Sequence, residues 1–227
     1  MADVDTEDAL DGDGPGGKPR YRGVSHKYGF FLALIAGAWL ISQTTPGTHR
    51  TGAIVYAASV SALLGVSAMY HTVWWPDGIR LWMRRLDHTM IFVMIAGCYT
   101  PMALLTMEEE TADWILLVEW GIVLLALVVN LAWPIRPKWV TPTLSVGAGW
   151  VGIFGFPDIL AATGYACVGL LLLGGLVYTV GALFYARKFP NPIPGIFGYH
   201  EVFHAMVLVG AALHFVAIKT WVFRLPA

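Results

Sequence analysis

Long apolar runs, separated by short polar or proline-rich stretches, dominate the chain. Most of these runs hold about 17 to 25 residues and few charges, which is the length an α-helix needs to cross a bilayer. They predict transmembrane helices at about residues 28–44, 51–72, 85–107, 114–133 and 199–223. A further run, at about 143–186, is too long for one span, and Pro157-Asp158 offers a break that divides it into two. The pattern therefore predicts an all-α fold, a bundle of seven transmembrane helices.

The composition agrees with this pattern. The chain is 57% hydrophobic and 13% charged, which is too apolar for a soluble domain with a hydrated surface. Both cysteines, Cys98 and Cys167, lie inside apolar runs, which disfavours a disulfide framework and a cysteine metal site. We therefore expect an integral, multi-pass membrane protein whose partners are membrane lipids, and we expect no nucleic-acid partner.

The charged residues indicate how the bundle lies in the membrane. Residues 1–17 carry six acids and end in Gly-Pro-Gly-Gly, so we interpret residues 1–19 as a disordered acidic tail and 20–227 as the seven-helix domain. If the N-terminus lies inside, eleven of the fourteen Lys and Arg residues fall on the inner side. Cytoplasmic segments carry an excess of these residues. We therefore predict a cytoplasmic N-terminus and an extracytoplasmic C-terminus.

Two histidines at the start of the last run point to a metal site. His200 and His204 are four residues apart, so in a helix both imidazoles share one face. Histidines are rare in membrane spans without a function, and imidazole is a common zinc ligand. The seven-span topology places His71 at the inner end of the second span and Asp87 at the inner start of the third. We therefore predict that His71, His200 and His204 bind one zinc ion, with Asp87 beside it.

This set of residues suits hydrolysis. Three histidine ligands leave one coordination position open, as in catalytic zinc sites. Asp87 could hold a water molecule or orient a ligand, and Ser67 lies four residues before His71 on the same helical face. Zinc lowers the pKa of a bound water from 15.7 to about 7, which provides a nucleophile at neutral pH. At bilayer depth, that nucleophile could cleave an amide or ester bond in a lipid.

Each candidate also has a structural interpretation. His200 and His204 could form a polar pair at a helix start, and Ser67 could be a small residue at a helix contact. Asp87 could pair with a neighbouring arginine or lie favourably at the positive end of the helix dipole.

The other histidines are predicted to have structural roles. His88 points about 100° away from its neighbour Asp87, which favours a structural hydrogen bond. His214 lies about 15 Å beyond His204 along a helix and is expected to make a polar contact deeper in the bundle. His26 and His49 lie near the ends of spans and are expected at the membrane interface.

The segment His200-Glu201-Val202-Phe203-His204 also fits H-E-x-x-H, in which the glutamate is the general base of metalloproteases. In intramembrane metalloproteases this motif comes early and an aspartate in a later helix completes the site. Here the motif lies in the last span, mostly apolar residues follow it, and the candidate third ligand lies upstream, which disfavours the protease interpretation and leaves the role of Glu201 open.

Three motifs resemble the signatures of the hemolysin III family: Ser67-Ala68-Met69-Tyr70-His71, then Leu86-Asp87-His88 with Ile95-Ala96-Gly97-Cys98-Tyr99-Thr100-Pro101, then His200-Glu201-Val202-Phe203-His204. That family belongs with the progestin and adipoQ receptors, which include the adiponectin receptors, and with alkaline ceramidases in a wider superfamily. The resemblance covers essentially all of the chain after the acidic tail. It implies seven helices, an inner N-terminus, and zinc held by His71, His200 and His204, with Asp87 nearby and Ser67 lining the site.

The resemblance and the residues together leave three functions open. The first is zinc-dependent, ceramidase-like hydrolysis of a lipid amide in membrane homeostasis, with a ceramide-like amide as the substrate. The second is a receptor or membrane-stress regulator in which the zinc is structural. The third is a channel-forming cytolysin, although no ring of charges along the spans favours a pore. The expected location is a prokaryotic plasma membrane, and the sequence does not indicate an oligomeric state.

Overall fold

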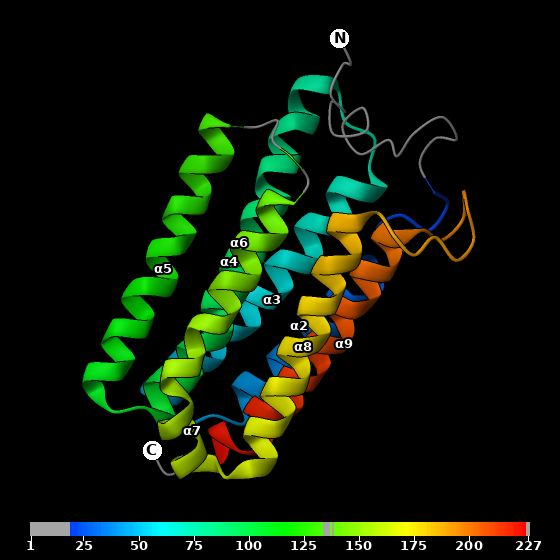
Figure 1. Ribbon diagram of the computed structural model, residues 1–227. Coiled ribbons are helices and arrows are strands. Elements are labelled where there is room, and N and C mark those ends of the chain that lie inside the picture. The colour runs from blue at the N-terminus through cyan, green and yellow to red at the C-terminus, as the bar shows by residue number, and fades with distance from the viewer. Residues whose placement is uncertain (1–18, 134–136, 138, 226–227) are drawn as a thin grey trace.

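The computed structural model describes residues 19–133, 137 and 139–225, and the regular elements in that part of the chain are helices (Figure 1). They form seven segments that are long and apolar enough to cross a membrane, which confirms the predicted seven-helix bundle. Six spans are single helices: α2 Val24–Ser42, α3 Thr48–Thr72, α4 Asp77–Thr106, α5 Glu109–Ala132, α8 Tyr165–Arg187 and α9 Tyr199–Thr220. The remaining span consists of α6 Val140–Trp150, η1 Val151–Gly155 and α7 Phe156–Thr163, and η2 Val222–Arg224 follows α9. The predicted acidic tail, residues 1–17, lies outside the described residues.

Two predicted boundaries are wrong. The fifth and sixth spans are divided at Gly164 rather than at Pro157-Asp158, and Gly164 has a φ of 81° that favours glycine. Pro157 lies instead in the first turn of α7, where a proline removes no helical hydrogen bond. The third span, α4, begins at Asp77, well before the predicted start at residue 85, because its charged first turns continue the helix beyond the apolar run.

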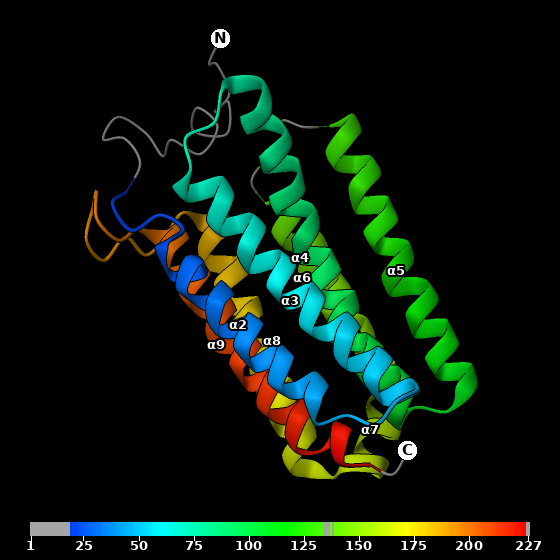
Figure 2. The same ribbon diagram turned by 180° about the vertical axis from the view of Figure 1, so that it is seen from behind.

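Six of the seven spans form a closed ring, and α5 lies outside it. In order around the ring, neighbouring contacts join α2, α3, α4, α6, α8 and α9, and α9 in turn contacts α2. Helix α5 packs against α4 and η1 and forms the outer edge of the bundle in both views (Figures 1 and 2). Short connections make successive spans antiparallel, so the end of α3, the start of α4 and the start of α9 meet at one end of the bundle.

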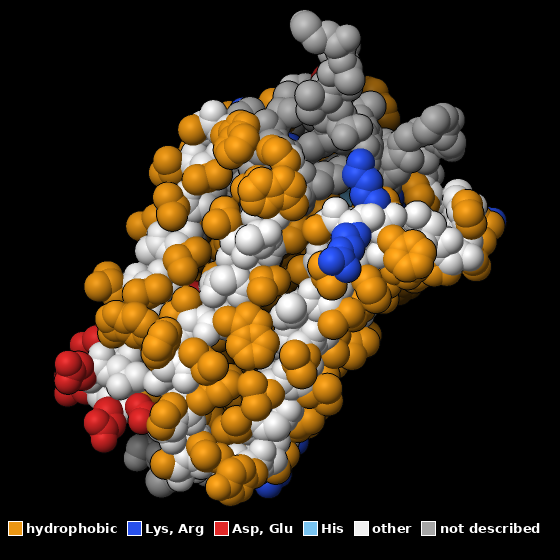
Figure 3. All heavy atoms as spheres, viewed as in Figure 1, with side chains coloured by type: hydrophobic (Ala, Val, Ile, Leu, Met, Phe, Trp, Pro, Cys, Tyr) orange, Lys and Arg blue, Asp and Glu red, His pale blue; other side chains and the backbone are white. Residues whose placement is uncertain are grey.

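The sides of the bundle are apolar and the charges lie at its ends. In Figure 3, hydrophobic side chains cover most of the visible length, and acidic side chains gather near the connection between α4 and α5. This surface and the seven spans are those of an integral, multi-pass membrane protein. Which end faces the cytoplasm stays a prediction from the distribution of Lys and Arg.

A small-residue contact holds α3 close to α4 near the middle of the bundle. A Cβ atom at Gly97 on α4 would overlap the side chain of Ser59 on α3. Only glycine allows this approach, and interfaces between membrane helices favour small residues for the same reason. The contact fixes the spacing of the two helices that carry His71 and Asp87.

Candidate metal centre

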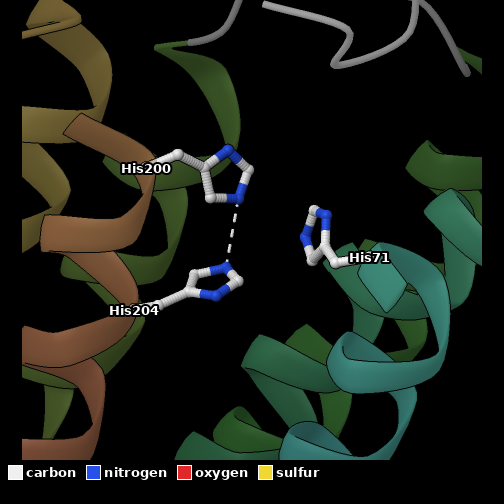
Figure 4. Close-up of side chains that lie close together, drawn as sticks. All are labelled: His71, His200 and His204. Atoms are coloured by element: carbon white, nitrogen blue, oxygen red, sulfur yellow. Dashed lines mark hydrogen bonds between the residues drawn. The ribbon is translucent and has the colours of Figure 1, made fainter. Parts of the chain in front are cut away.

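Three buried imidazoles from two helices face one another at one end of the bundle (Figure 4). His71 comes from α3, and His200 and His204 come from α9. Their exposed fractions are 3%, 4% and 3%, respectively. The structure therefore brings together the three histidines that were predicted from the sequence as metal ligands.

The spacing of their nitrogens fits a single metal ion. One ligand nitrogen from each residue lies within 4.8 Å of the other two, and the Nε2 atoms of His200 and His204 are 3.1 Å apart. Two nitrogens bound tetrahedrally to zinc at about 2.0–2.1 Å would be about 3.3 Å apart. The three side chains can therefore hold one metal ion, and imidazole nitrogens are common ligands of zinc.

The local structure of α9 explains the geometry of the pair. The helix begins at Tyr199, so His200 and His204 occupy its first two turns on one face. The Oε2 atom of Glu201 accepts a hydrogen bond from the backbone N–H of Gly198 at 2.7 Å, which caps the helix. This cap fixes where the helix starts and hence where its histidines point.

The second oxygen of Glu201 is also engaged. It forms a buried ion pair with the Nε atom of Arg22, which lies just before α2. Both carboxylate oxygens are therefore used to cap α9 and to tie it to the N-terminal segment. This arrangement gives Glu201 a structural role and counts against its use as the base of a metalloprotease.

Asp87 and Ser67 both lie at the histidine cluster. The Oδ2 atom of Asp87 is 3.7 Å from Nε2 of His71, and the aspartate is buried at 8% exposure. Ser67 is buried on α3 one turn before His71, and its Oγ atom is 2.9 Å from Nδ1 of His26. Asp87 is thus close enough to orient His71 or a water beside it, whereas Ser67 contacts a fourth histidine.

That fourth histidine, His26, was missed in the sequence. It was expected only to lie at the membrane interface, but it is 2% exposed and its ring stacks on His204 with centroids 3.9 Å apart. Its Nε2 atom lies 3.3 Å from the carbonyl oxygen of His204. Because a carbonyl oxygen only accepts, Nε2 carries the proton, and Nδ1 accepts the hydroxyl proton of Ser67. The available signal was that His26 begins α2 at the same end of the bundle as the cluster.

The N-terminal segment covers the cluster. Backbone N–H groups of Arg20 and Tyr21 donate to the carbonyl oxygens of Gly195 and Ile196 at 3.2 and 3.3 Å, respectively. Next along the chain, a Cβ atom at Gly23 would overlap the side chain of His71. The segment is therefore fixed to the loop before α9 and lies in direct contact with the candidate ligand on α3.

A cavity runs from the cluster into the bundle. His204 and Asp87 line it at the cluster, and His214, about 15 Å farther along α9, also lines it. Its volume is about 140 Å³, which is about ten times what one water needs on this measure. Most of its other lining residues are aliphatic, sulfur-containing or aromatic, among them Leu63, Ile91 and Phe203. The cavity therefore joins a polar head, at the histidines, to an apolar channel suited to a hydrocarbon chain.

The chain is similar to known proteins over most of its length. A family model described as "Haemolysin-III related" matches residues 17–215. The hemolysin-3 homolog of Bacillus subtilis (strain 168) is 30% identical over 196 residues, covering 86% of this chain and 84% of that protein. Hemolysin-3 of Bacillus cereus is 27% identical over 204 residues, covering 88% and 89%. The adiponectin receptor protein of Drosophila melanogaster is 26% identical over 217 residues, covering 86% of this chain and 48% of that protein.

Proposed function

The chain belongs to the Haemolysin-III related family, and from that premise we propose that it is a zinc-dependent hydrolase that cleaves a ceramide-like lipid amide. We place it in a prokaryotic plasma membrane, where it would adjust the lipid composition. One observation carries the proposal: three buried histidines converge inside a membrane bundle, and two of them, His200 and His204, line a mostly apolar cavity. An open three-histidine site is the arrangement of catalytic zinc, and lipid is the substrate within reach.

The histidine cluster defines where the chemistry takes place. When bound to His71, His200 and His204, zinc supplies Lewis-acid polarisation of a carbonyl and activation of water at neutral pH. The reaction adds water across the amide, giving a carboxylic acid and an amine. Because the cluster is buried, competing bulk water is excluded and the electrostatic interactions within it are strengthened.

Asp87 and Ser67 would supply the proton transfer and the positioning. The Oδ2 atom of Asp87, next to His71, is placed to take the proton of the attacking water and to return it to the leaving nitrogen. The hydroxyl of Ser67 donates its hydrogen bond to Nδ1 of His26, so its lone pairs can accept a hydrogen bond from the N–H of the substrate amide. The acyl chain would occupy the apolar part of the cavity.

The test is hydrolysis by detergent-purified, zinc-loaded protein, measured as fatty acid released from an N-acyl lipid. Asp87→Asn should lower turnover about 10²- to 10⁴-fold, the usual effect of losing a general acid–base group. His49→Gln is the matched control, because that histidine lies at the opposite end of the bundle, where it contacts the carbonyl oxygen of Leu225. Folded, zinc-loaded protein that hydrolyses no lipid amide or ester would overturn the proposal.

A receptor or membrane-stress regulator with structural zinc is the second candidate. It is supported by the position of the cluster, which joins α3 to α9 beneath the N-terminal segment, and by the similarity to an adiponectin receptor protein. This candidate predicts that zinc removal lowers the melting temperature while no lipid is hydrolysed at any zinc content. A cytolytic channel is less supported, because the cavity walls are mostly apolar. Leakage from liposomes that contain the protein would support the channel instead.

A further inference from the structure

Away from the histidine cluster, the cavity wall carries two polar atoms that the cluster does not use. The hydroxyl of Tyr178 on α8 and Nδ1 of His214 on α9 are buried, and neither has a hydrogen-bond partner among the described residues. Both side chains line the cavity. A buried polar group without a partner is costly, and more so within a membrane, so these two atoms call for a ligand.

The helices are shaped to hold these two rings. A Cβ atom at Gly174 on α8 would lie 2.6 Å from Nε2 of His214, and a Cβ atom at Gly210 on α9 would lie 2.6 Å from the ring of Tyr178. Each ring therefore occupies the space left by a glycine on the opposite helix. The rings meet edge to face, with centroids 5.3 Å apart. This reciprocal packing fixes both side chains at the cavity wall.

The hydrogen-bonding roles of the two atoms are complementary. Nε2 of His214 lies 3.1 Å from the carbonyl oxygen of Leu171, which can only accept, so Nε2 carries the proton. Nδ1 is then an acceptor, whereas the hydroxyl of Tyr178 can donate. A donor and an acceptor on the same wall match a single hydroxyl group, which needs one of each.

We propose that Tyr178 and His214 form a second, polar subsite that binds a hydroxyl group carried partway along the hydrocarbon chain of a lipid. The inference rests on the proposed function for one point, that the lipid head lies at the histidine cluster. His214 is ten residues beyond His204 on α9, which is about 15 Å. Carbon–carbon bonds of about 1.5 Å advance an extended chain by about 1.3 Å each. The hydroxyl group would therefore lie about twelve bonds from the head.

Binding of fatty acids tests this subsite without requiring any hydrolysis. Octadecanoic, 2-hydroxyoctadecanoic and 12-hydroxyoctadecanoic acids have the same chain length and differ only in the hydroxyl group. We would measure the Kd of each acid for detergent-purified, zinc-loaded protein by isothermal titration calorimetry. The 12-hydroxy acid should bind about five- to tenfold more tightly than the other two, the effect of a net buried hydrogen bond.

Two variants assign the effect to the subsite. Tyr178→Phe removes only the hydroxyl and should bring the three Kd values together, as should His214→Gln, which keeps a donor for Leu171. Tyr56→Phe is the matched control, because this buried tyrosine on α3 is not among the residues that line the cavity, and it should keep the preference.

The possible outcomes separate this inference from the proposed function. Equal Kd values for the three acids in the wild-type protein, binding of none of them, or a preference that survives in Tyr178→Phe would each overturn the subsite and indicate that water occupies the two polar atoms. A preference for the 12-hydroxy acid in a protein that hydrolyses no amide would leave the subsite standing and contradict only the hydrolase proposal.

Discussion

Replacing Glu201 with glutamine separates two interpretations of the H-E-x-x-H motif. In the structure, this glutamate caps α9 through Gly198 and pairs with Arg22. A glutamine of nearly the same size keeps an oxygen that accepts the N–H of Gly198, so the substitution removes mainly the negative charge. If the glutamate were instead a catalytic base, the same substitution would abolish turnover and leave the fold intact.

The expected magnitude follows from burial. The two side chains of the pair are 1% and 2% exposed, and removing one partner of a buried ion pair destabilises a protein by about 3–5 kcal/mol. For a chain of this size, 1 kcal/mol corresponds to about 2–4 °C in Tm. Glu201→Gln should therefore lower Tm by roughly 6–20 °C. The double variant Arg22→Met/Glu201→Gln should recover much of this loss, because it leaves no uncompensated charge from the pair.

Thermal unfolding in detergent, followed by circular dichroism, measures the three Tm values, and zinc content and turnover are measured well below them. The ion-pair interpretation predicts a destabilised Glu201→Gln variant that keeps its zinc and most of its activity while folded. A variant as stable as the wild type but inactive, or a double variant no more stable than the single one, would refute this reasoning.

The remaining predictions concern the helix packing, the metal and the orientation. Gly97→Ala should lower the free energy of unfolding by about 1–3 kcal/mol, because its methyl group would overlap Ser59; Ser59→Gly should rescue it. The control is Gly121→Ala, where a Cβ atom meets nothing within 4 Å; it should be neutral or stabilising by up to about 1 kcal/mol. A denaturant titration measures both changes, and equal effects of Gly97→Ala and Gly121→Ala would contradict the proposed contact. A metal chelator should lower the Tm of the wild-type protein and leave that of His71→Ala unchanged, because only a folded state that binds the ion is stabilised by it; equal shifts would exclude this histidine as a ligand. A cysteine in place of Glu109 should react with an impermeant maleimide on intact cells, whereas labelling only after lysis would reverse the predicted orientation.

The sequence predicted the number of spans because bilayer thickness sets a narrow range of helix lengths. It did not predict the break between the fifth and sixth spans, because Pro157 is a strong helix breaker only in a helix interior. In the structure, this proline begins α7, and the chain turns at Gly164. With 25 glycines in the chain, no sequence signal distinguishes the one that adopts a positive φ at this turn.

The sequence predicted at which end of the bundle the candidate site lies, but not which face of each helix points into it. Topology alone placed His71 and Asp87 at the same end of the bundle as the histidine pair of α9. The spans lack a strict amphipathic period, so the inward face of α2 could not be assigned, and His26 was placed at the interface although it stacks on His204. The partner of Glu201 was also hidden, because Arg22 lies 179 residues away in the chain and only the closed ring of helices brings them together.

The most direct test of the three-histidine centre is zinc-edge X-ray absorption on detergent-purified wild-type protein, combined with metal analysis. We expect one zinc per chain, with three imidazole nitrogens at about 2.0–2.1 Å, and a loss of bound zinc in His71→Ala, His200→Ala and His204→Ala. Sulfur in the ligand shell, or full zinc content in any of the three variants, would contradict the centre on which the proposed chemistry depends.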